Sequence, residues 1–418
     1  MNPERIIAGL DIGSAKTTVV IAEAVGDRKN TPTLKILGVG QARTTGLRRG
    51  IVSDIEETTR SIKKAIDDAE RMAGTKVDAL YAGIAGEHVR AMISKGIVAV
   101  NGDEISKADV DRANDVARAQ PVPQDRELLH AIPQEYSVDK NQGIRDPIGM
   151  IGTRLETEMY LVTIGASPAM NLRKSVEKAG YRVRELVLEP LASALSVLTE
   201  DEKELGVALV EMGAGTTDIA VFHEGKIRHL GTVNYGGNNV TSDIVQGIGV
   251  TQADAERLKE RYGCAYEPLV DPGDVVQLPS TVAQGERHIP REVLAHIIHQ
   301  RMDEIFNLVL TEIERAGFAQ RLNGGVVITG GAAAMQGVAE LAADVFGTGV
   351  RIGSPEENIS GLADSVDAPR FATVVGLALY GANRSAAGFS PAGKHRALAG
   401  AGVDKFTKRL KTWLEDFF

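Results

Sequence analysis

The sequence predicts an α/β protein built from two related halves, because one local pattern occurs twice. Residues 8–21 read AGLDIGSAKTTVVI and residues 207–221 read VALVEMGAGTTDIAV, so each has two apolar, strand-forming runs around a glycine turn. The two segments align without a gap, with Asp11 against Glu211. A glycine turn exposes backbone N–H groups that can cradle a phosphate. We therefore expect two related halves that face each other across a ligand.

Composition narrows the class of protein. At 418 residues the chain is long enough for two or more domains, and its net charge of −9 argues against a dedicated nucleic-acid binder. Cys264 is the only cysteine, which excludes an internal disulfide, fits a reducing cytoplasm and predicts a small buried side chain. No apolar run approaches the ~18 residues of a membrane span. Pro3, Glu4 and Asp11 interrupt any secretory signal, so we expect a cytosolic chain unless something tethers it.

The first half is expected to contain a sheet and an inserted module. We predict these elements: three strands within residues 5–40, a helix from Ser53 or Asp54 to about Ala73, a strand at Ala79 to Ala85, a return to the main sheet at Met159 to Ala166, a helix to Ala179, a strand at Val183 to Val187, and a small-residue helix from Glu189 to Leu198. Residues 86–158 change in pattern and are interpreted as an inserted module with its own small sheet. Small residues on a helix permit close approach to another helix.

The second half repeats the scheme. We predict these elements: the hairpin at 207–221, a strand near Ile227 to Val233, helices at Asn239 to Gly247 and Thr251 to Tyr262, a long helix from Arg291 to Gly317 with Val293, Ile298, Met302, Phe306 and Val309 on one side, a buried strand in GVVITGG (325–331), and a small-residue helix at Ala372 to Gly381. Residues 263–290 are turn-rich and are assigned to a second inserted module. The Gly, Ala, Ser and Pro composition after Gly381 is typical of a flexible linker.

The first glycine turn is not a Walker loop. Lys16 and Thr17 follow Gly13, but the spacing is wrong, and residues 18–21 continue as a strand where the Walker motif needs a helix. One such hairpin alone is equally consistent with an ordinary turn. Two matching hairpins and a strand that ends in a glycine pair favour a phosphate site.

Together these motifs resemble the superfamily of actin, sugar kinases and heat-shock ATPases, and within it the FtsA family of bacterial cell-division proteins. The segment TSDIVQGIGVTQADAERLK (241–259) and the position of the inserted module carry the closer resemblance, which covers nearly all of residues 5–418. It implies an actin-like fold of two related RNase H-like domains, with an FtsA-type inserted subdomain (1C) in the first half and a 2B-type insertion in the second. The implied parts are subdomain 1A (1–85 and 159–203), 1C (86–158), 2A (204–240 and 321–365), 2B (241–320), a return helix to 1A (366–381), a flexible linker (382–402) and an amphipathic membrane-targeting helix (403–418).

The resemblance also implies ATP with Mg²⁺ between the halves. The residues expected to hold the phosphates are Asp11, Gly13, Ser14, Ala15, Lys16 and Thr17 on one side and Gly213, Gly215, Thr216 and Thr217 on the other. Gly330, Gly331 and Ala332 would lie beneath the adenosine. Glu256 and Lys259 match positions that contact ribose or base, although an i,i+3 surface pair is equally consistent.

Acidic residues carry the expected metal chemistry. Asp11 and Glu211 would orient water around Mg²⁺, which keeps most of its hydration shell. Glu189 matches the place where relatives polarise the attacking water, although a Glu before a Pro also suits a helix start. In this superfamily the second loop usually carries Asp. The extra methylene of Glu211 moves the carboxylate and so changes how it contacts a hydrated ion. We therefore expect at most weak ATPase activity.

The last fifteen residues, DKFTKRLKTWLEDFF, predict a membrane anchor. At 100° per residue its apolar side chains fall within an arc of roughly 140°, namely Phe406, Leu410, Trp413, Leu414, Phe417 and Phe418. Lys405 and Lys408 lie off the arc, and Arg409 flanks it. A basic, aromatic-bearing amphipathic helix behind a linker favours an interfacial anchor over a helix docked on the protein's own core. One such helix binds weakly, so stable attachment needs several copies, as in a polymer.

Partner predictions follow from the same resemblance. It implies that the 2B subdomain receives the C-terminal peptide of the tubulin-like FtsZ, and Arg301 resembles a basic position there, although an ordinary exposed Arg fits equally. Further implied contacts are self-association into filaments and downstream division proteins through 1C. His296 and His299 stand at a spacing that suits a metal, but no third ligand is evident. The alternatives are another actin-like adaptor such as a PilM-like pilus-assembly protein, or a sugar- or acetate-kinase-type phosphotransferase.

Overall fold

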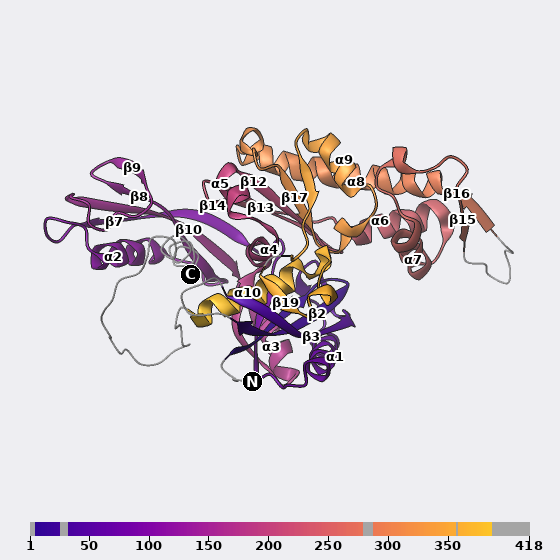
Figure 1. The fold of residues 1–418 in the computed structure, drawn as a ribbon, viewed down its shortest axis with the longest axis horizontal. Coiled ribbons are helices and arrows are strands. Elements are labelled where there is room, and N and C mark those ends of the chain that lie inside the picture. Colours follow the sequence, from indigo (N-terminus) through magenta and orange to yellow (C-terminus); the bar gives the residue numbers. More distant parts are fainter. Residues whose placement is uncertain (1–4, 26–31, 279–286, 357, 387–418) are drawn as a thin grey trace. The chain divides into compact units, whose positions relative to one another are not determined.

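A computed structural model describes residues 5–25, 32–278, 287–356 and 358–386 (Figure 1). The described chain divides into two compact units. The first unit comprises the described residues up to Val25 together with Thr33–Glu87 and Lys174–Ala382, and the second centres on His88–Arg173. Within the described ranges, no helix is long and apolar enough to cross a membrane.

The described part of the first unit contains two large sheets and two small two-stranded ones. The six-stranded sheet has the order β11-β6-β1-β2-β3-β19, with the bounds β1 Ile6–Ile12, β2 Lys16–Val25, β3 Thr33–Arg43, β6 Ala79–Ile84, β11 Arg182–Leu188 and β19 Ile359–Gly361. The five-stranded sheet has the order β14-β13-β12-β17-β18, with the bounds β12 Val207–Met212, β13 Thr217–His223, β14 Lys226–Val233, β17 Val326–Thr329 and β18 Val350–Ile352.

The two sheets share one topology, which confirms the two related halves. In each, three antiparallel strands are followed by two parallel ones: β3-β2-β1-β6-β11 matches β14-β13-β12-β17-β18. The helices between matching strands also correspond, with α1 (Ile55–Ala73), α3 (Ala166–Lys178) and α4 (Glu189–Val197) against α8 (Arg291–Arg315), α9 (Val338–Phe346) and α10 (Ala372–Ala386). This repeated β-β-β-α-β-α-β-α order is the RNase H-like arrangement that the sequence predicts.

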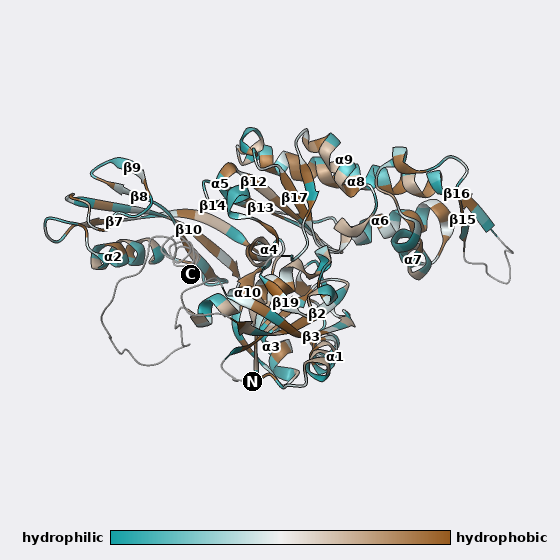
Figure 2. Cartoon of the chain, in the orientation of Figure 1, coloured by the Kyte–Doolittle hydropathy of each residue, from teal (hydrophilic) through white to brown (hydrophobic). Residues whose placement is uncertain are grey.

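Apolar strands and one face of α8 form the core of the second half. Every residue of β12 is buried, and brown, hydrophobic colouring follows β12, β13 and β17 in Figure 2. The predicted face of α8 is buried at Ile298, Met302, Phe306 and Val309, whereas Val293 is 44% exposed. Val293 lies in the first turn of α8, where the neighbouring Leu294 turns inward instead. Burying such side chains contributes about 1.5–3 kcal/mol each.

Shorter elements complete the first unit: β4 Leu47–Arg48, β5 Ile51–Val52, α5 Glu200–Leu205, α6 Gly237–Ile244, α7 Gln252–Tyr262, β15 Val275–Leu278 and β16 Arg287–Pro290. A π-helical turn over Val245–Gly249 follows α6. The helix predicted at Asn239 to Gly247 thus starts two residues earlier and ends as a wider turn. Cys264 is buried, as expected.

The second unit is a four-stranded antiparallel sheet with one helix. Its strand order is β7-β10-β8-β9, and its elements are β7 Arg90–Ala99, α2 Lys107–Arg118, β8 Arg126–Val138, β9 Asn141–Ile144 and β10 Arg154–Gly165. The expectation that Met159 to Ala166 returns to the main sheet is wrong. Met159 to Gly165 belong to β10, because a register shift between Glu158 and Met159 lets the strand continue its pairing with β8, and Ala166 begins helix α3.

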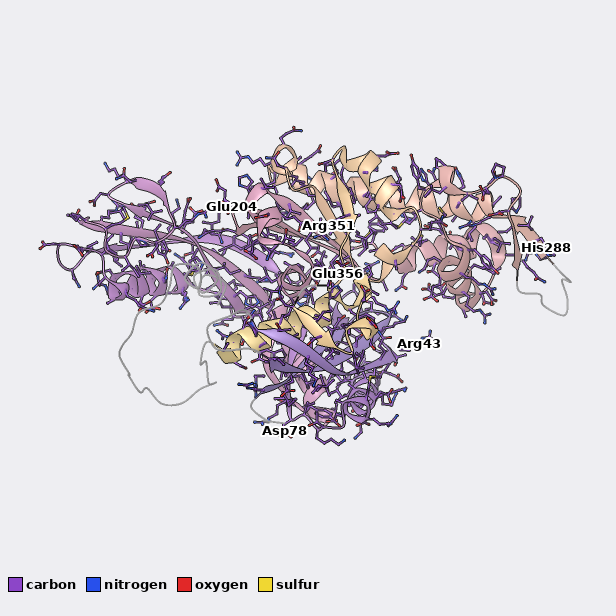
Figure 3. All side chains as sticks on the ribbon, in the orientation of Figure 1. Arg43, Asp78, Glu204, His288, Arg351 and Glu356 are labelled. Atoms are coloured by element: carbon purple, nitrogen blue, oxygen red, sulfur yellow. The ribbon has the colours of Figure 1, made fainter. Side chains whose placement is uncertain are left out.

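Helices α4 and α10 cross at backbone contact, as their small residues predict. A Cβ added at Gly376 would lie 1.8 Å from the carbonyl oxygen of Ala192, so only glycine fits there. The Ser196 hydroxyl donates to the carbonyl oxygen of Ala372 at 2.7 Å. Arg351, labelled in Figure 3, donates to the carbonyl oxygen of Val197 at 2.6 Å and so fixes the end of α4 against β18.

Candidate functional site

The two glycine hairpins adopt the same geometry. The Gly13 N–H donates to the Lys16 carbonyl at 3.1 Å, and the Gly213 N–H donates to the Thr216 carbonyl at 2.9 Å. The turns also abut, because a Cβ added at Gly215 would lie 2.8 Å from Ser14 Oγ. The structure therefore brings the two predicted phosphate loops together.

Backbone hydrogen bonds from the start of α6 hold the second loop in place. The Gly237 N–H donates to the Gly213 carbonyl at 3.0 Å, and the Asn238 N–H donates to the Ala214 carbonyl at 2.8 Å. The Thr217 hydroxyl donates to the Tyr235 carbonyl at 2.9 Å. The first turn of α6 thus fixes the shape of the loop, which leaves little conformational entropy to lose when a ligand binds.

The first loop rests on a segment that the sequence interpretation missed. The Thr44 N–H donates to the Ala15 carbonyl at 2.9 Å, and the hydroxyls of Thr17 and Thr44 lie 2.9 Å apart. Further along this segment, Arg49 has a left-handed φ of 48°, and its Cα would lie 3.4 Å from a Cβ at Gly215. The Arg49-Gly50 pair between two short strands is a hairpin-turn signal that could have drawn attention to it.

Four carboxyl groups surround the loops, of which Glu211 and Asp218 are buried and Asp11 and Glu189 are partly buried. Burial raises the pKa of Asp11 to about 7 and the pKa of Asp218 to about 6. Burial, opposed by hydroxyl hydrogen bonds, raises the pKa of Glu211 to about 8. The pKa of Glu189 lies well above its usual value because of burial first and then the charges of Asp11, Glu211 and Asp218. A cation placed here stabilises the ionised forms, so this acidic set fits a hydrated divalent metal.

Glu211 is held by two helices at once. The Ser193 hydroxyl of α4 donates to Glu211 Oε2 at 2.9 Å, and the Thr373 hydroxyl of α10 donates to Glu211 Oε1. The two hydroxyl oxygens are themselves 3.1 Å apart. The sequence interpretation identified the small-residue helices but not these hydroxyls, because no local pattern links a Ser and a Thr that are 180 positions apart.

The other acidic residues have different surroundings. Asp218 accepts from the Thr232 hydroxyl at 2.7 Å and from the Thr216 hydroxyl at 3.1 Å. The Glu189 side chain lies over the end of β6, since its Cγ would be 2.8 Å from a Cβ at Gly83. Among the residues that the structure describes, none forms a hydrogen bond or an ion pair with the Asp11 carboxylate.

The glycine pair after β17 crosses the base of the second hairpin. Gly330 has a φ of 92°, and a Cβ there would lie 2.5 Å from the Met212 carbonyl oxygen. A 3₁₀ turn over Gly331–Ala334 follows, and a Cβ at Gly331 would meet nothing within 4 Å. The predicted adenosine residues Gly330, Gly331 and Ala332 therefore lie directly beside the second loop, with open space above Gly331.

Glu256 and Lys259 belong to the same region. Lys259 Nζ donates to the Gly237 carbonyl at 3.0 Å, to the Thr241 hydroxyl at 2.8 Å and to Glu256 at 2.8 Å. The Lys259 side chain is only 10% exposed. The pair is therefore more than an exposed helix pair, because it links α7 to the turn that supports the second loop.

Arg301 lies in an open groove along α8. Its guanidinium donates to Asp243 of α6 and to Glu304, and it lies 5.7 Å from the centre of the Tyr235 ring. These carboxylates raise its pKa. The groove has a volume of about 760 Å³ and is lined by Asp243, His296, Ile297, Gln300, Arg301, Asp303, Glu304, Asn307, Leu308 and Thr311.

The two helix histidines have partners other than a metal. His296 Nδ1 lies 3.0 Å from Glu267 Oε1, and His299 Nδ1 lies 2.9 Å from the Ala265 carbonyl oxygen. Over the described part of the chain, no three His, Cys, Asp or Glu side chains are grouped so as to hold a metal ion directly. The predicted membrane residues lie outside the described residues, namely Lys405, Phe406, Lys408, Arg409, Leu410, Trp413, Leu414, Phe417 and Phe418.

Comparisons with known proteins identify the family to which this sequence is similar. The family model "Cell division protein FtsA" matches residues 208–376, and the model "SHS2 domain inserted in FTSA" matches residues 86–163. The chain is 39% identical to the cell division protein FtsA of Pseudomonas aeruginosa, covering 99% of this chain and 98% of that protein.

Solved structures show the same fold at low identity. The PilM-PilN type IV pilus biogenesis complex matches with a TM-score of 0.63 at 17% identity, covering 90% of this chain and 98% of that one. MreB5 of Spiroplasma citri bound to ADP matches with a TM-score of 0.55 at 14% identity, covering 92% and 98%.

Proposed function

We propose that this chain, which belongs to the FtsA family of cell division proteins, binds ATP with Mg²⁺ between its two hairpin loops and uses the bound state to organise a membrane-attached assembly at the division site. The observation that carries the proposal is the abutting pair of hairpins with equivalent turns, one from each half of an actin-like fold.

The nucleotide part of the proposal is supported by the shape and chemistry of the loops. The turn backbone at Ser14, Ala15 and Gly215, together with the side chains of Ser14 and Lys16, suits a polyphosphate. The Gly13 and Gly213 N–H groups and the hydroxyls of Thr17, Thr216 and Thr217 bond within the protein and shape the two turns instead. The open space at Gly331 suits a flat base or ribose. MreB5 of Spiroplasma citri, whose solved structure shows the same fold, is bound to ADP in that structure.

The magnesium part rests on the acidic set. Asp11, Glu189, Glu211 and Asp218 have raised pKa values, and a divalent cation offsets the cost of ionising them by favouring the carboxylate forms. When bound, the ion neutralises phosphate charge and polarises the transferring phosphoryl group. Glu189, which lies over the end of β6, remains the side chain proposed from the family resemblance to polarise the attacking water.

We expect weak hydrolysis. Both Glu211 carboxylate oxygens already accept hydroxyl hydrogen bonds, which leaves this side chain less able to arrange water around the ion. A single-turnover assay with excess protein should show phosphate release over minutes or longer. Rapid, Mg²⁺-dependent release within seconds would contradict this expectation.

The groove at Arg301 is the proposed contact for the FtsZ C-terminal peptide. Its lining mixes a guanidinium with carboxylates and the apolar side chains of Ile297 and Leu308, which suits a short peptide that carries both charge and apolar residues. Fluorescence anisotropy with a labelled FtsZ C-terminal peptide tests it. Arg301→Glu should abolish binding, whereas Arg315→Glu, on the last turn of the same helix and outside the groove, should not.

Membrane attachment and polymerisation are proposed from the C-terminal segment and the family. The pattern of Phe406, Leu410, Trp413, Leu414, Phe417 and Phe418 with Lys405, Lys408 and Arg409 favours anionic lipid. Imaging on an anionic lipid monolayer with ATP tests both properties together. Loss of binding after deletion of 404–418, with retention of filaments at high concentration, is the expected result.

The alternative functions are not favoured. The pilus-assembly structure shows the fold alone at 17% identity, whereas the FtsA relative is 39% identical over nearly the full chain. A sugar or acetate kinase would release ADP only when its substrate is present. We expect no substrate-dependent ADP release with sugars or acetate.

A further inference from the structure

The two equivalent acidic residues of the hairpins have unlike surroundings. Asp11 and Glu211 occupy the same register position, opposite Thr18 and Asp218 respectively, one step before the end of each first strand. In the described residues the Asp11 carboxylate has no hydrogen-bond partner, whereas both oxygens of Glu211 accept hydroxyl hydrogen bonds. Two positions related by the repeat therefore differ in their hydrogen bonding.

The partners of Glu211 lie on the helices that cross between the halves. Ser193 belongs to α4, which follows the last strand of the first half, and Thr373 belongs to α10. Both hydroxyls are buried, and they lie 3.1 Å from each other as well as against Glu211. The carboxylate thus joins β12, α4 and α10 at one point, two residues before Gly213 of the second phosphate loop.

The length of the Glu side chain makes this junction possible. An Asp at this position would withdraw the carboxylate by about 1.5 Å, one carbon–carbon bond. A contact of 2.9 Å to Ser193 would then exceed hydrogen-bond range. The contacts with Ser193 and Thr373 therefore require the longer Glu side chain at this position.

The crossing around this junction has almost no free space. Gly376 of α10 meets the backbone of Ala192 directly, and Ser196 of α4 bonds the first carbonyl of α10. The end of β17 is tied to the same region, because the Thr329 hydroxyl donates to the Pro369 carbonyl at 3.1 Å. A shift of the second loop must therefore move α4 and α10, since packed elements shift as units rather than deform.

We propose that Glu211 is a latch that ties the second phosphate loop to α4 and α10, and that Asp11 alone of the equivalent pair faces the magnesium ion. The latch couples nucleotide occupancy of the loop to the crossing of the two helices. The assignment of Asp11 to the magnesium ion rests on the proposed ATP function, whereas the assignment of Glu211 to the latch does not.

The first test measures the latch without nucleotide. A double-mutant cycle of Glu211→Ala and Thr373→Val is followed by chemical unfolding. Thr373→Val is isosteric and should lower the folding equilibrium constant at least tenfold in the wild-type background. In the Glu211→Ala background, where the hydrogen bond is already lost, the same substitution should lower it less than threefold. Thr373→Ser keeps the hydroxyl and should stay within threefold of wild type. Equal losses from Thr373→Val in both backgrounds, or equal behaviour of Thr373→Val and Thr373→Ser, overturn the latch.

The second test uses a fluorescent ATP analogue. The ratio of its dissociation constants in EDTA and in Mg²⁺ reports the metal contact, and its release rate reports the latch. Thr373→Val should release the analogue at least fivefold faster with the ratio unchanged. Asp11→Asn should bring the ratio close to one, and Glu211→Gln, which keeps the side-chain length but removes the charge, should preserve it.

The outcomes separate the two proposals. A collapse of the ratio in Glu211→Gln as large as in Asp11→Asn overturns the division of roles. If the wild-type protein binds no analogue, the proposed function and the Asp11 assignment fail, and the unfolding cycle alone decides the latch.

Discussion

A Cβ at Gly376 would lie 1.8 Å from the carbonyl oxygen of Ala192, so helices α10 and α4 touch along their backbones. This contact sets how closely the two connecting helices cross, and the hydroxyls of Ser193 and Thr373 meet Glu211 beside it. The glycine is therefore a structural requirement of the candidate site.

Replacement of Gly376 tests that requirement. Gly376→Ala forces a methyl group into the backbone of α4, so we expect a loss of at least about 3 kcal/mol in the free energy of unfolding. Gly349→Ala is the control, because a Cβ there meets nothing within 4 Å. Chemical denaturation compares the two. Equal, small effects would show that the helices separate without cost.

The adenosine assignment is tested at neighbouring glycines. Gly331→Ala places a methyl group in open space, so we expect stability within about 0.5 kcal/mol of wild type but several-fold weaker ATP binding. Gly330→Ala should instead destabilise the fold, because of its φ of 92° and the Met212 carbonyl. Calorimetric titration with ATP and thermal unfolding separate the effects. Unchanged affinity in Gly331→Ala would place the adenosine elsewhere.

Lys259 provides a third prediction. Lys259→Met removes three hydrogen bonds that hold Gly237, Thr241 and Glu256 together beneath the second loop. We expect roughly tenfold weaker ATP binding, equivalent to about 1.4 kcal/mol. Arg261→Met on the same helix has no contact with that turn and should bind normally. An equal loss in both variants would indicate a general effect on α7.

The buried His130 should make the stability of the second unit decrease at acidic pH. Burial first, and then the charge of Arg384, lower its pKa from 6.5 to about 3. Because the folded-state pKa lies below the unfolded value, the unfolded chain binds the extra proton between these values. Its contribution to stability is therefore complete above pH 6.5 and is lost as pH falls toward 3. At pH 5 the loss is about 2 kcal/mol.

Urea unfolding midpoints between pH 7.5 and 4.5 check this expectation. Asp11, Glu211 and Asp218, whose raised pKa values have the opposite effect on this slope, are present in every variant, so the difference from wild type isolates the histidine. His130→Gln should gain stability relative to wild type as pH falls, whereas His296→Gln, at an exposed histidine paired with Glu267, should keep the wild-type pH dependence. A decline of the same slope in His130→Gln would assign the acid sensitivity to other groups.

Local patterns predicted much of the fold because they are carried by consecutive residues. The hairpins at Asp11 and Glu211, the buried GVVITGG strand and the close helices all follow from glycine turns, apolar runs and small residues. The assignment of Met159 to the main sheet was wrong, because an apolar run identifies a buried strand but not the sheet in which it pairs.

The sequence predicted the two hairpin turns of the candidate site but not the contacts that support them, and the role of these turns in phosphate binding stays a prediction. Phosphate turns have a local signature, whereas the Ser193–Glu211–Thr373 junction joins three distant segments and depends on tertiary packing. The Thr44 contacts to the first loop are likewise non-local. The roles of Arg301, Glu256 and the terminal helix stay predictions.

The most direct test of the nucleotide clamp is equilibrium titration of the wild-type protein with a fluorescent ATP analogue, with Mg²⁺ and with EDTA. We expect one site per chain, clearly tighter binding with Mg²⁺, and loss of binding when Gly215→Val fills the contact with Ser14. No binding, or binding that is insensitive to both Mg²⁺ and Gly215→Val, would contradict a nucleotide held between the two hairpins.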